Sequence, residues 1–405
     1  MKKIRPIAAA VLLGTLALGA HADAITDWNT KAAEFITDAK MGTPPAMRLM
    51  ALAQTAAYEA VNGVTRRYPD ATAAAARDAS PEAALAASQR AVFLKVLPGQ
   101  ATMIEAAYNA ALANIADGTA KSAGIAAGEK AAADLLARRL DDGAGTPDSY
   151  RPVTAAGQYV PTVAVAVPQW GQRKPWMLKD AAQFRPIAPP ALTSVAWTQD
   201  FNEIKDFGGR ASTQRNAEQT EIARFWDYSL PAIYHGVLRS VALQPGRDLT
   251  RNARLFAVTA QAMDDALIAV FEAKYHYRFW RPVTAIRNAD IDNNDNTARD
   301  AGWNALIDVP MHPEYPSAHG ALASTMAVVV KADIGNGPMP VLSTSSPTAT
   351  AKGTVRRWTR LEDLVTEVGN ARVWGGLHFR TATQVGEQMG AKIGSLAAQR
   401  LDSGL

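Results

Sequence analysis

Helical segments follow one another along most of this sequence, and alternating β patterns are nearly absent. The segments are rich in Ala, Leu, Met and Glu, which favour helices, and Gly, Pro and Asp separate them. Thr43-Pro44 and Ser80-Pro81 are typical helix starts, because a hydroxyl caps the first turn and Pro fits the first helical position. We therefore predict an all-α fold, with helices over residues 24–40, 44–61, 81–97, 101–116, 122–140, 198–207, 212–228, 249–279, 317–330, 362–370 and 378–401.

The composition changes between residues 141 and 196, where Pro, Gly and Thr recur. A stretch of this length without helical patterning is longer than most loops, so we expect it to cross the surface. Within it, residues 159–167 are apolar but flanked by prolines, which predicts an extended linker segment. We predict two helical bundles, over residues 23–140 and 197–405, joined by this connection.

The amino terminus has the pattern of a secretory signal peptide. Three basic residues in the first five are followed by an apolar run over residues 6–20, and Ala20-His21-Ala22 matches an A-x-A cleavage site. The apolar run is shorter than the roughly 20 residues that a membrane anchor needs. We expect a signal peptide over residues 1–22, a periplasmic or secreted protein, and no stable membrane insertion after cleavage.

Charge and cysteine content exclude several classes of function. The net charge of the whole chain is +4, and removal of Lys2, Lys3 and Arg5 with the signal peptide leaves +1. Without a basic tract, a nucleic-acid partner is not expected. The chain has no Cys, which excludes disulfides, thiolate nucleophiles, zinc fingers and iron–sulfur clusters.

A first block of chemistry-bearing residues runs from Lys274 to Arg281-Pro282. Seven residues are about two helical turns, so the spacing places both cations on one helix face. The surrounding aromatic residues indicate burial: Phe271, Tyr275, Tyr277, Phe279 and Trp280. Buried cations need an anionic partner, and no local pattern of carboxylates supplies one. The alternative is a solvated basic stripe.

A second block reads His312-Pro-Glu-Tyr-Pro-Ser317-Ala318-His319-Gly320 and precedes a helix-forming run. Ser317 is a plausible N-cap, and the next backbone N–H groups would then be free to bind an anion at the helix start. His319 would lie over that position. The alternative is an ordinary capped helix with a surface histidine.

A third block contains Arg372, the pair Gly375-Gly376, and His378. A spacing of six residues does not place Arg372 and His378 on one helix face. The glycine pair permits a bend, so both side chains can point inward from a loop that leads into the last helix. The alternative is a loop arginine and a histidine that caps the helix.

Together the blocks supply cations, a hydroxyl, a helix amino terminus and histidines. Neither an H-E-x-x-H zinc motif nor a glycine-rich nucleotide loop is present. This inventory fits a tetrahedral oxyanion such as phosphate or vanadate. Two histidines can then serve as ligand or nucleophile and as acid or base.

The three blocks, K-x6-R-P, P-S-x-H and R-x5-H in this order, resemble the type-2 phosphatidic acid phosphatase superfamily, which includes the vanadium-dependent haloperoxidases. Residues 45–62 also resemble bacterial haloperoxidase-type members. The resemblance implies an all-helical fold of two related bundles of the vanadium haloperoxidase type. It also implies a site in the carboxy-terminal bundle that holds vanadate, or phosphate in a phosphatase.

The resemblance assigns a role to each matching residue. Lys274, Arg281 and Arg372 would neutralise the oxyanion, and Ser317 and the Ala318 N–H would donate to its oxygens. His378 would be the vanadium ligand or the phosphorylated nucleophile, and His319 the acid or base on the opposite side. His312 stands where the family's bromoperoxidases carry His. Two positions depart from the family pattern, since Ala318 replaces Gly and Ala371 replaces Ser.

Three hypotheses about function follow. The first is an exported vanadium-dependent haloperoxidase-like enzyme that oxidises halide with hydrogen peroxide. The second is an acid phosphatase that hydrolyses phosphate esters through a phosphohistidine in the same pocket. The third is an exported protein that binds an oxyanion or is purely structural.

Overall fold

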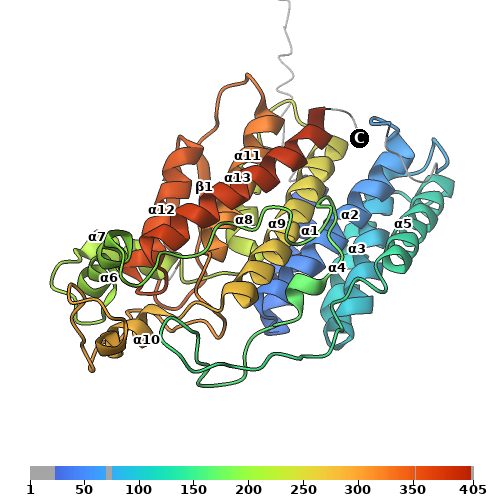
Figure 1. Ribbon diagram of the computed structural model, residues 1–405. Helices are drawn as coiled ribbons and strands as arrows, with labels where there is room; N and C mark the ends of the chain where they lie inside the picture. Colours follow the sequence, from blue (N-terminus) through green and yellow to red (C-terminus); the bar gives the residue numbers. More distant parts are fainter. Residues whose placement is uncertain (1–22, 70–74, 352, 403–405) are drawn as a thin grey trace, which may run out of the picture.

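The computed structural model describes residues 23–69, 75–351 and 353–402, so the expected signal peptide lies outside the described residues. Within the described part, thirteen α-helices account for most of the chain, and the only strands are two short ones (Figure 1). The predicted all-α fold is confirmed. None of the described helices is long and apolar enough to cross a bilayer.

The amino-terminal helices pack side by side, in blue and cyan in Figure 1. Ser80 caps the third of them as predicted, since its hydroxyl accepts from the Ala83 N–H at 3.1 Å. The predicted cap at Thr43 is wrong: Gly42 is the N-cap, and the Thr43 hydroxyl instead bonds Ser229 at 2.6 Å. These helices are α1 (Ala24–Asp38), α2 (Thr43–Thr65), α3 (Pro81–Val96), α4 (Ala101–Ala113) and α5 (Thr119–Arg138).

The later helices include two that the sequence analysis did not predict, α8 and α10. The helix predicted from residue 212 starts later, because Asn216 and Gln219 form a capping box that fixes the start of α7. The set is α6 (Val195–Gly208), α7 (Ala217–Phe225), α8 (Pro231–Ala242), α9 (Leu249–Tyr277), α10 (Pro282–Arg287), α11 (Ala318–Ile334), α12 (Leu361–Trp374) and α13 (Arg380–Asp402).

A small hairpin lies beside α8. Its strands are β1 (Leu342–Ser345) and β2 (Val355–Trp358), which pair antiparallel with Leu342 opposite Trp358. Gly236 of α8 lies against Thr344 of β1, so closely that an added Cβ would be 2.1 Å from the Thr344 hydroxyl. The hairpin therefore covers this helix and adds Leu342 and Trp358 to the core.

Helix α9 is the central element, because it packs against α2 on one side and against α11 and α13 on the other (Figure 1). Most of its buried residues from Ala253 to Phe271 are apolar, and the buried exceptions include the carboxyls of Asp264 and Asp265. The large core consequently runs without interruption from α1 and α2 through α9 to α11 and α13. The carboxyl end of α9 is thereby held at the base of the carboxy-terminal helices.

The segment between α5 and α6 crosses the surface and contains only a three-residue 3₁₀ turn, Trp170–Gln172. Arg173 anchors it: the guanidinium donates to Asp264 of α9 at 2.7 Å and to Asp142 at 2.9 Å. Asp265, the next residue on α9, accepts three backbone N–H groups, from Trp176, Met177 and Leu178. Buried carboxylates therefore fix this segment to the central helix.

Candidate oxyanion site

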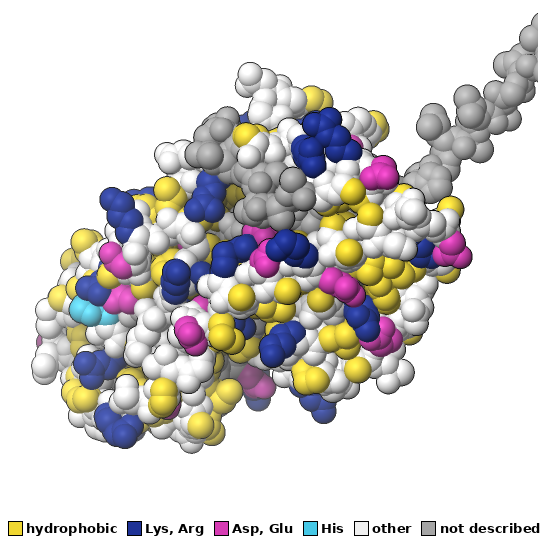
Figure 2. All heavy atoms as spheres, turned by 90° about the vertical axis from the view of Figure 1, so that its right-hand side faces the viewer, with side chains coloured by type: hydrophobic (Ala, Val, Ile, Leu, Met, Phe, Trp, Pro, Cys, Tyr) yellow, Lys and Arg dark blue, Asp and Glu magenta, His cyan; other side chains and the backbone are white. Residues whose placement is uncertain are grey.

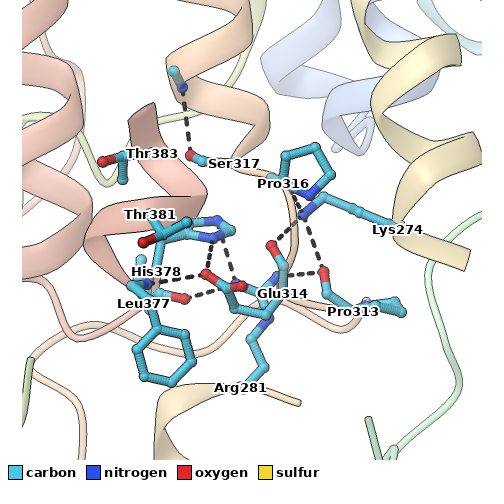
Figure 3. A network of polar contacts seen from close by, with 12 residues as sticks. Lys274, Arg281, Pro313, Glu314, Pro316, Ser317, Leu377, His378, Thr381 and Thr383 are labelled. Carbon is cyan, nitrogen blue, oxygen red and sulfur yellow. Dashed lines mark hydrogen bonds and ion pairs between the residues drawn. The ribbon is translucent and has the colours of Figure 1, made fainter. Parts of the chain in front are cut away.

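The fold brings the three sequence blocks together around one buried point (Figure 3). Lys274 lies in the last turn of α9, Arg281 directly before α10, and Arg372 in the last turn of α12. Ser317 caps α11, and His378 lies in the turn before α13. All five side chains are at most 2% exposed.

Lys274 reaches this point from a helix that ends sooner than predicted. Arg278 adopts a left-handed conformation with φ 54°, and its N–H closes on the Lys274 carbonyl at 2.8 Å. Arg281 is therefore outside α9, and the prediction that it shares a helix face with Lys274 is wrong. The two cations nevertheless converge, because the chain turns back into α10.

The Lys274 ammonium group donates to three backbone carbonyls in the segment before α11. The acceptors are Pro313 at 3.0 Å, Glu314 at 2.7 Å and Pro316 at 2.6 Å (Figure 3). An ammonium has three protons, so these bonds use all of them. Burial and the nearby Arg281 hold the pKa of Lys274 well below its usual range. Lys274 thus fixes the shape of the loop that carries Ser317.

Arg281 connects two histidines. Its guanidinium donates to the carbonyls of His312 and Leu377, both at 2.9 Å, and contacts His312 Nδ1 at 2.9 Å. A longer contact of 3.4 Å reaches His378 Nε2. Burial lowers the pKa of Arg281 to about 10, which leaves it charged at neutral pH. His312 is therefore at the site, with its ring 5.1 Å from that of Phe271.

The amino terminus of α11 forms as the sequence predicts. The Ser317 hydroxyl accepts from the Gly320 N–H at 3.4 Å, which leaves the first amides of the helix without a helical partner. His319 is 7% exposed, and its Nε2 has no partner among the described residues. Burial, together with Arg372, holds the pKa of His319 well below its usual value, so the ring is neutral.

Arg372 lies within α12, not in the loop that the sequence analysis predicted. It donates to the Trp226 carbonyl at 2.8 Å, while its Nε has no partner in the part of the chain that the structure describes. Burial lowers the pKa of Arg372 to about 10. The predicted bend is present, since Gly376 has φ 78° and turns His378 back over the end of α12.

Glu314 is a member of the site that the sequence analysis missed. It is completely buried, and its Oε1 lies 2.9 Å from His378 Nδ1 and accepts from the Phe379 N–H at 3.0 Å (Figure 3). Burial raises the pKa of this carboxyl to about 8, against the opposing effect of Lys274 and Arg281. The only signal for Glu314 in the sequence was its position between two candidate site residues, His312 and Ser317.

The arrangement suits an oxyanion. Three buried cations face a single buried carboxyl, and Arg372 Nε and His319 Nε2 are buried without a partner among the described residues. Such orphaned polar atoms are costly unless a further group binds them. No cluster of three His, Asp or Glu that could hold a bare metal ion occurs within the described ranges. The residues present therefore fit vanadate or phosphate.

The candidate oxyanion site does not lie at the large hollow on the surface of the molecule. A hollow of about 1160 Å³ lies between α1, α4 and the start of α9, and none of the motif residues line it. Its rim carries Asp23, Asp27, Glu34 and Glu82 beside Lys31. On the face shown in Figure 2, basic and acidic side chains both occur across the surface with apolar ones between them. The chemical inventory of the buried blocks is therefore the better guide.

Comparison with known proteins agrees with this geometry. Residues 254–404 match the model of the VCPO second helical-bundle domain, a range that contains the three blocks. Vanadium chloroperoxidase from Curvularia inaequalis is 27% identical over 173 residues, which is 35% of this chain. The match spans only 28% of that relative's length.

Solved structures extend the likeness of fold to nearly the whole chain. A bacterial vanadium-dependent iodoperoxidase has a TM-score of 0.79 at 22% identity, over 93% of this chain and 96% of its own. An apo bacterial vanadium-dependent chloroperoxidase has a TM-score of 0.72 at 19% identity, over 88% and 93%. The fold is that of the bacterial vanadium haloperoxidases. The resemblance to their superfamily that the three blocks predicted is confirmed.

Proposed function

We propose that this protein is a vanadium-dependent haloperoxidase that oxidises halide with hydrogen peroxide. The observation that carries the proposal is the buried cluster of Lys274, Arg281 and Arg372, whose charges all act on the buried His378 ring and one of which, Arg281, contacts its Nε2. The names of its relatives, which include vanadium-dependent chloro- and iodoperoxidases, support it. Bound vanadate would supply a Lewis acid that activates peroxide toward halide without a change of oxidation state.

The chain's own residues would hold and orient the anion. His378 Nε2 would be its ligand, and Arg281 and Arg372 would neutralise its charge. Ser317 and the Ala318 N–H would donate to its oxygens at the start of α11, where the helix dipole favours negative charge. Lys274 would need to release one carbonyl to donate as well, since all three of its protons are used.

His319 would move the proton. A neutral imidazole accepts a proton from hydrogen peroxide, and the low pKa of His319 keeps the ring neutral. Its free Nε2 is the atom available for that transfer. His312, beside Arg281 and Phe271, would lie at the edge where a halide approaches.

Acid phosphatase activity is the second candidate. The contact of His378 Nδ1 with Glu314 favours it, because a nucleophile oriented by a hydrogen-bonded carboxyl is the usual arrangement for attack. His378 Nε2 would attack phosphorus of a phosphate ester, and His319 would protonate the leaving oxygen. The three cations would stabilise the charge on the transferred group.

One paired assay separates the candidates. The mature protein is measured with and without orthovanadate, in one arm with bromide, hydrogen peroxide and a brominatable dye, and in the other with a chromogenic phosphate ester. Vanadate-dependent bromination would establish the haloperoxidase. Ester hydrolysis that vanadate inhibits, without bromination, would make the protein a phosphatase. Vanadate binding without either turnover would leave the oxyanion-binding hypothesis.

Export is part of the proposal. The pattern of residues 1–22 leads us to propose cleavage before Asp23 and a periplasmic or secreted location. Amino-terminal sequencing of protein recovered from the host's periplasm or medium should begin at Asp23. Recovery from the cytoplasm with Met1 retained would contradict it.

A further inference from the structure

We propose that Glu314 is the positioning residue of this site: it fixes the tautomer and the ring direction of His378, so that Nε2 presents its lone pair to the oxyanion. The inference rests on the proposed oxyanion site and adds to it a residue of the second block that the pattern P-S-x-H does not include. Three observations carry it, namely the anchoring of Glu314, the donors around His378, and the burial of both side chains.

Glu314 is held by main chain and side chain at once. Its N–H donates to the Phe279 carbonyl at 2.9 Å, and its carbonyl accepts from Lys274 at 2.7 Å. Its Oε1 accepts from the Phe379 N–H at 3.0 Å. The residue is thus tied to α9, to the turn after α9, and to the start of α13. A carboxyl fixed at both ends can hold a neighbouring ring in one direction.

The donors around His378 determine its tautomer. The guanidinium of Arg281 can only donate, so His378 Nε2, 3.4 Å away, must carry the lone pair. Nδ1 then carries the proton and donates to Glu314 Oε1 at 2.9 Å. One tautomer thus satisfies both neighbours, the one in which Nε2 is free to bind vanadium or attack phosphorus.

Burial makes this contact consequential. Glu314 is 0% exposed and His378 is 1% exposed, so water is not available to replace the carboxyl as an acceptor. Partners of this kind fix the tautomer of a ligating histidine and raise its basicity, and their loss costs about 10- to 100-fold in affinity. Glu314 Oε2 has no partner among the described residues, so the geometry depends on Oε1 alone.

Two substitutions separate the position of the Glu314 oxygen from the ability of the side chain to ionise. Glu314→Gln keeps an oxygen at the place of Oε1 and cannot ionise, and the new amide nitrogen falls where Oε2 has no partner among the described residues. Glu314→Asp keeps an ionisable carboxyl but withdraws its oxygens by one methylene from His378. The matched control is Asp200→Asn. Asp200 is a buried carboxylate that accepts the Thr381 N–H at 3.0 Å, two residues after the Phe379 N–H that Glu314 accepts.

The readout is the ¹⁵N spectrum of the ring nitrogens in histidine-labelled, oxyanion-free protein, with His378 assigned by comparison with His378→Gln. Vanadate affinity is measured separately by calorimetry, and far-UV circular dichroism confirms folding. We expect wild type, Glu314→Gln and Asp200→Asn to show a single tautomer with the proton on Nδ1. Glu314→Asp should show both tautomers and bind vanadate about 10- to 100-fold more weakly.

Other results would overturn the inference. Glu314→Asp with a single tautomer and wild-type affinity would show that the carboxyl does not position the ring. Glu314→Gln with a mixed tautomer, or with a loss of affinity beyond 100-fold, would show that an oxygen at the place of Oε1 does not hold the ring, and this result would refute the inference even if the Asp variant does not fold. If wild type binds no vanadate, the proposed function fails, while the tautomer comparison still tests Glu314.

Discussion

At the scale of single residues, the polar atoms of the site fall into two groups. Some make all their hydrogen bonds within the chain, and others are buried without a partner among the described residues. The Lys274 ammonium group belongs to the first group, because three carbonyls of the segment 313–316 accept hydrogen bonds from all of its protons. Arg372 Nε and His319 Nε2 belong to the second group, because both are buried without a partner among the described residues. Lys274 therefore fixes the shape of the loop at the site, and Arg372 Nε and His319 Nε2 are the atoms available to a ligand or a transferred proton.

Substitution of His319 tests this division. His319→Ala removes a free proton acceptor but no bond on which the loop depends, so turnover should fall about 10²- to 10⁴-fold while vanadate affinity stays within about tenfold. Steady-state kinetics and calorimetry on the same preparation give both values. His276→Ala is the control, since His276 is exposed at the end of α9. Turnover of His319→Ala equal to wild type would remove His319 from the chemistry.

At the scale of elements, local patterns predicted most helices, but the sequence did not reveal which distant residues meet. Ser80 and Ser317 are caps as expected, because a cap depends on neighbours within one turn. Glu314 was missed because its partner His378 is 64 residues away. Arg372 was placed in a loop because the two glycines that follow it indicated an earlier end for α12 than Trp374.

The close packing of α11 and α13 likewise could not be predicted from local sequence patterns. Gly386, Gly390 and Gly394 recur at intervals of four on α13, so they lie along one face of that helix. An added Cβ at Gly386 would lie 2.4 Å from the Ser317 carbonyl, and one at Gly390 would lie 2.2 Å from the Ala321 carbonyl. The glycines therefore let α13 approach the start of α11, where the site lies.

Gly390→Ala should consequently destabilise the protein. Alanine favours a helix over glycine by about 1 kcal/mol, but here its methyl would force the two helices apart, at a cost of about 1–3 kcal/mol or more. Urea unfolding followed by circular dichroism measures the net change in the free energy of unfolding. Gly99→Ala is the control, because nothing lies within 4 Å of its added Cβ. A Gly390→Ala protein more stable than wild type would refute the packing argument.

At the scale of the whole molecule, buried ionic contacts attach the long segment between α5 and α6 to the central helix. Composition predicted a long irregular stretch there, yet its anchoring to Asp264 and Asp265 could not be predicted, because Arg173 lies 91 residues from Asp264. The same helix carries Lys274 two to three turns later. The anchor and the site therefore share one rigid element.

Asp265 makes this anchoring dependent on pH. Burial raises its pKa from 3.8 to about 6, although three backbone N–H groups stabilise the charged form. Because the folded pKa exceeds the unfolded one, its contribution to stability is complete below pH 3.8 and is lost as the pH rises through about 6. Asparagine does not titrate. The stability of wild type relative to Asp265→Asn should therefore fall by up to about 3 kcal/mol between pH 4 and pH 7.

Chemical denaturation of both proteins at several pH values across this window measures the difference directly. The comparison cancels the titration of groups that do not interact with residue 265, since the two chains differ only there. Asp206→Asn, at an exposed position on α6, is the matched control for an Asp-to-Asn substitution. A difference between wild type and Asp265→Asn that stays constant across the window would show that burial at Asp265 does not shift its titration, and that the segment's attachment to α9 is insensitive to pH.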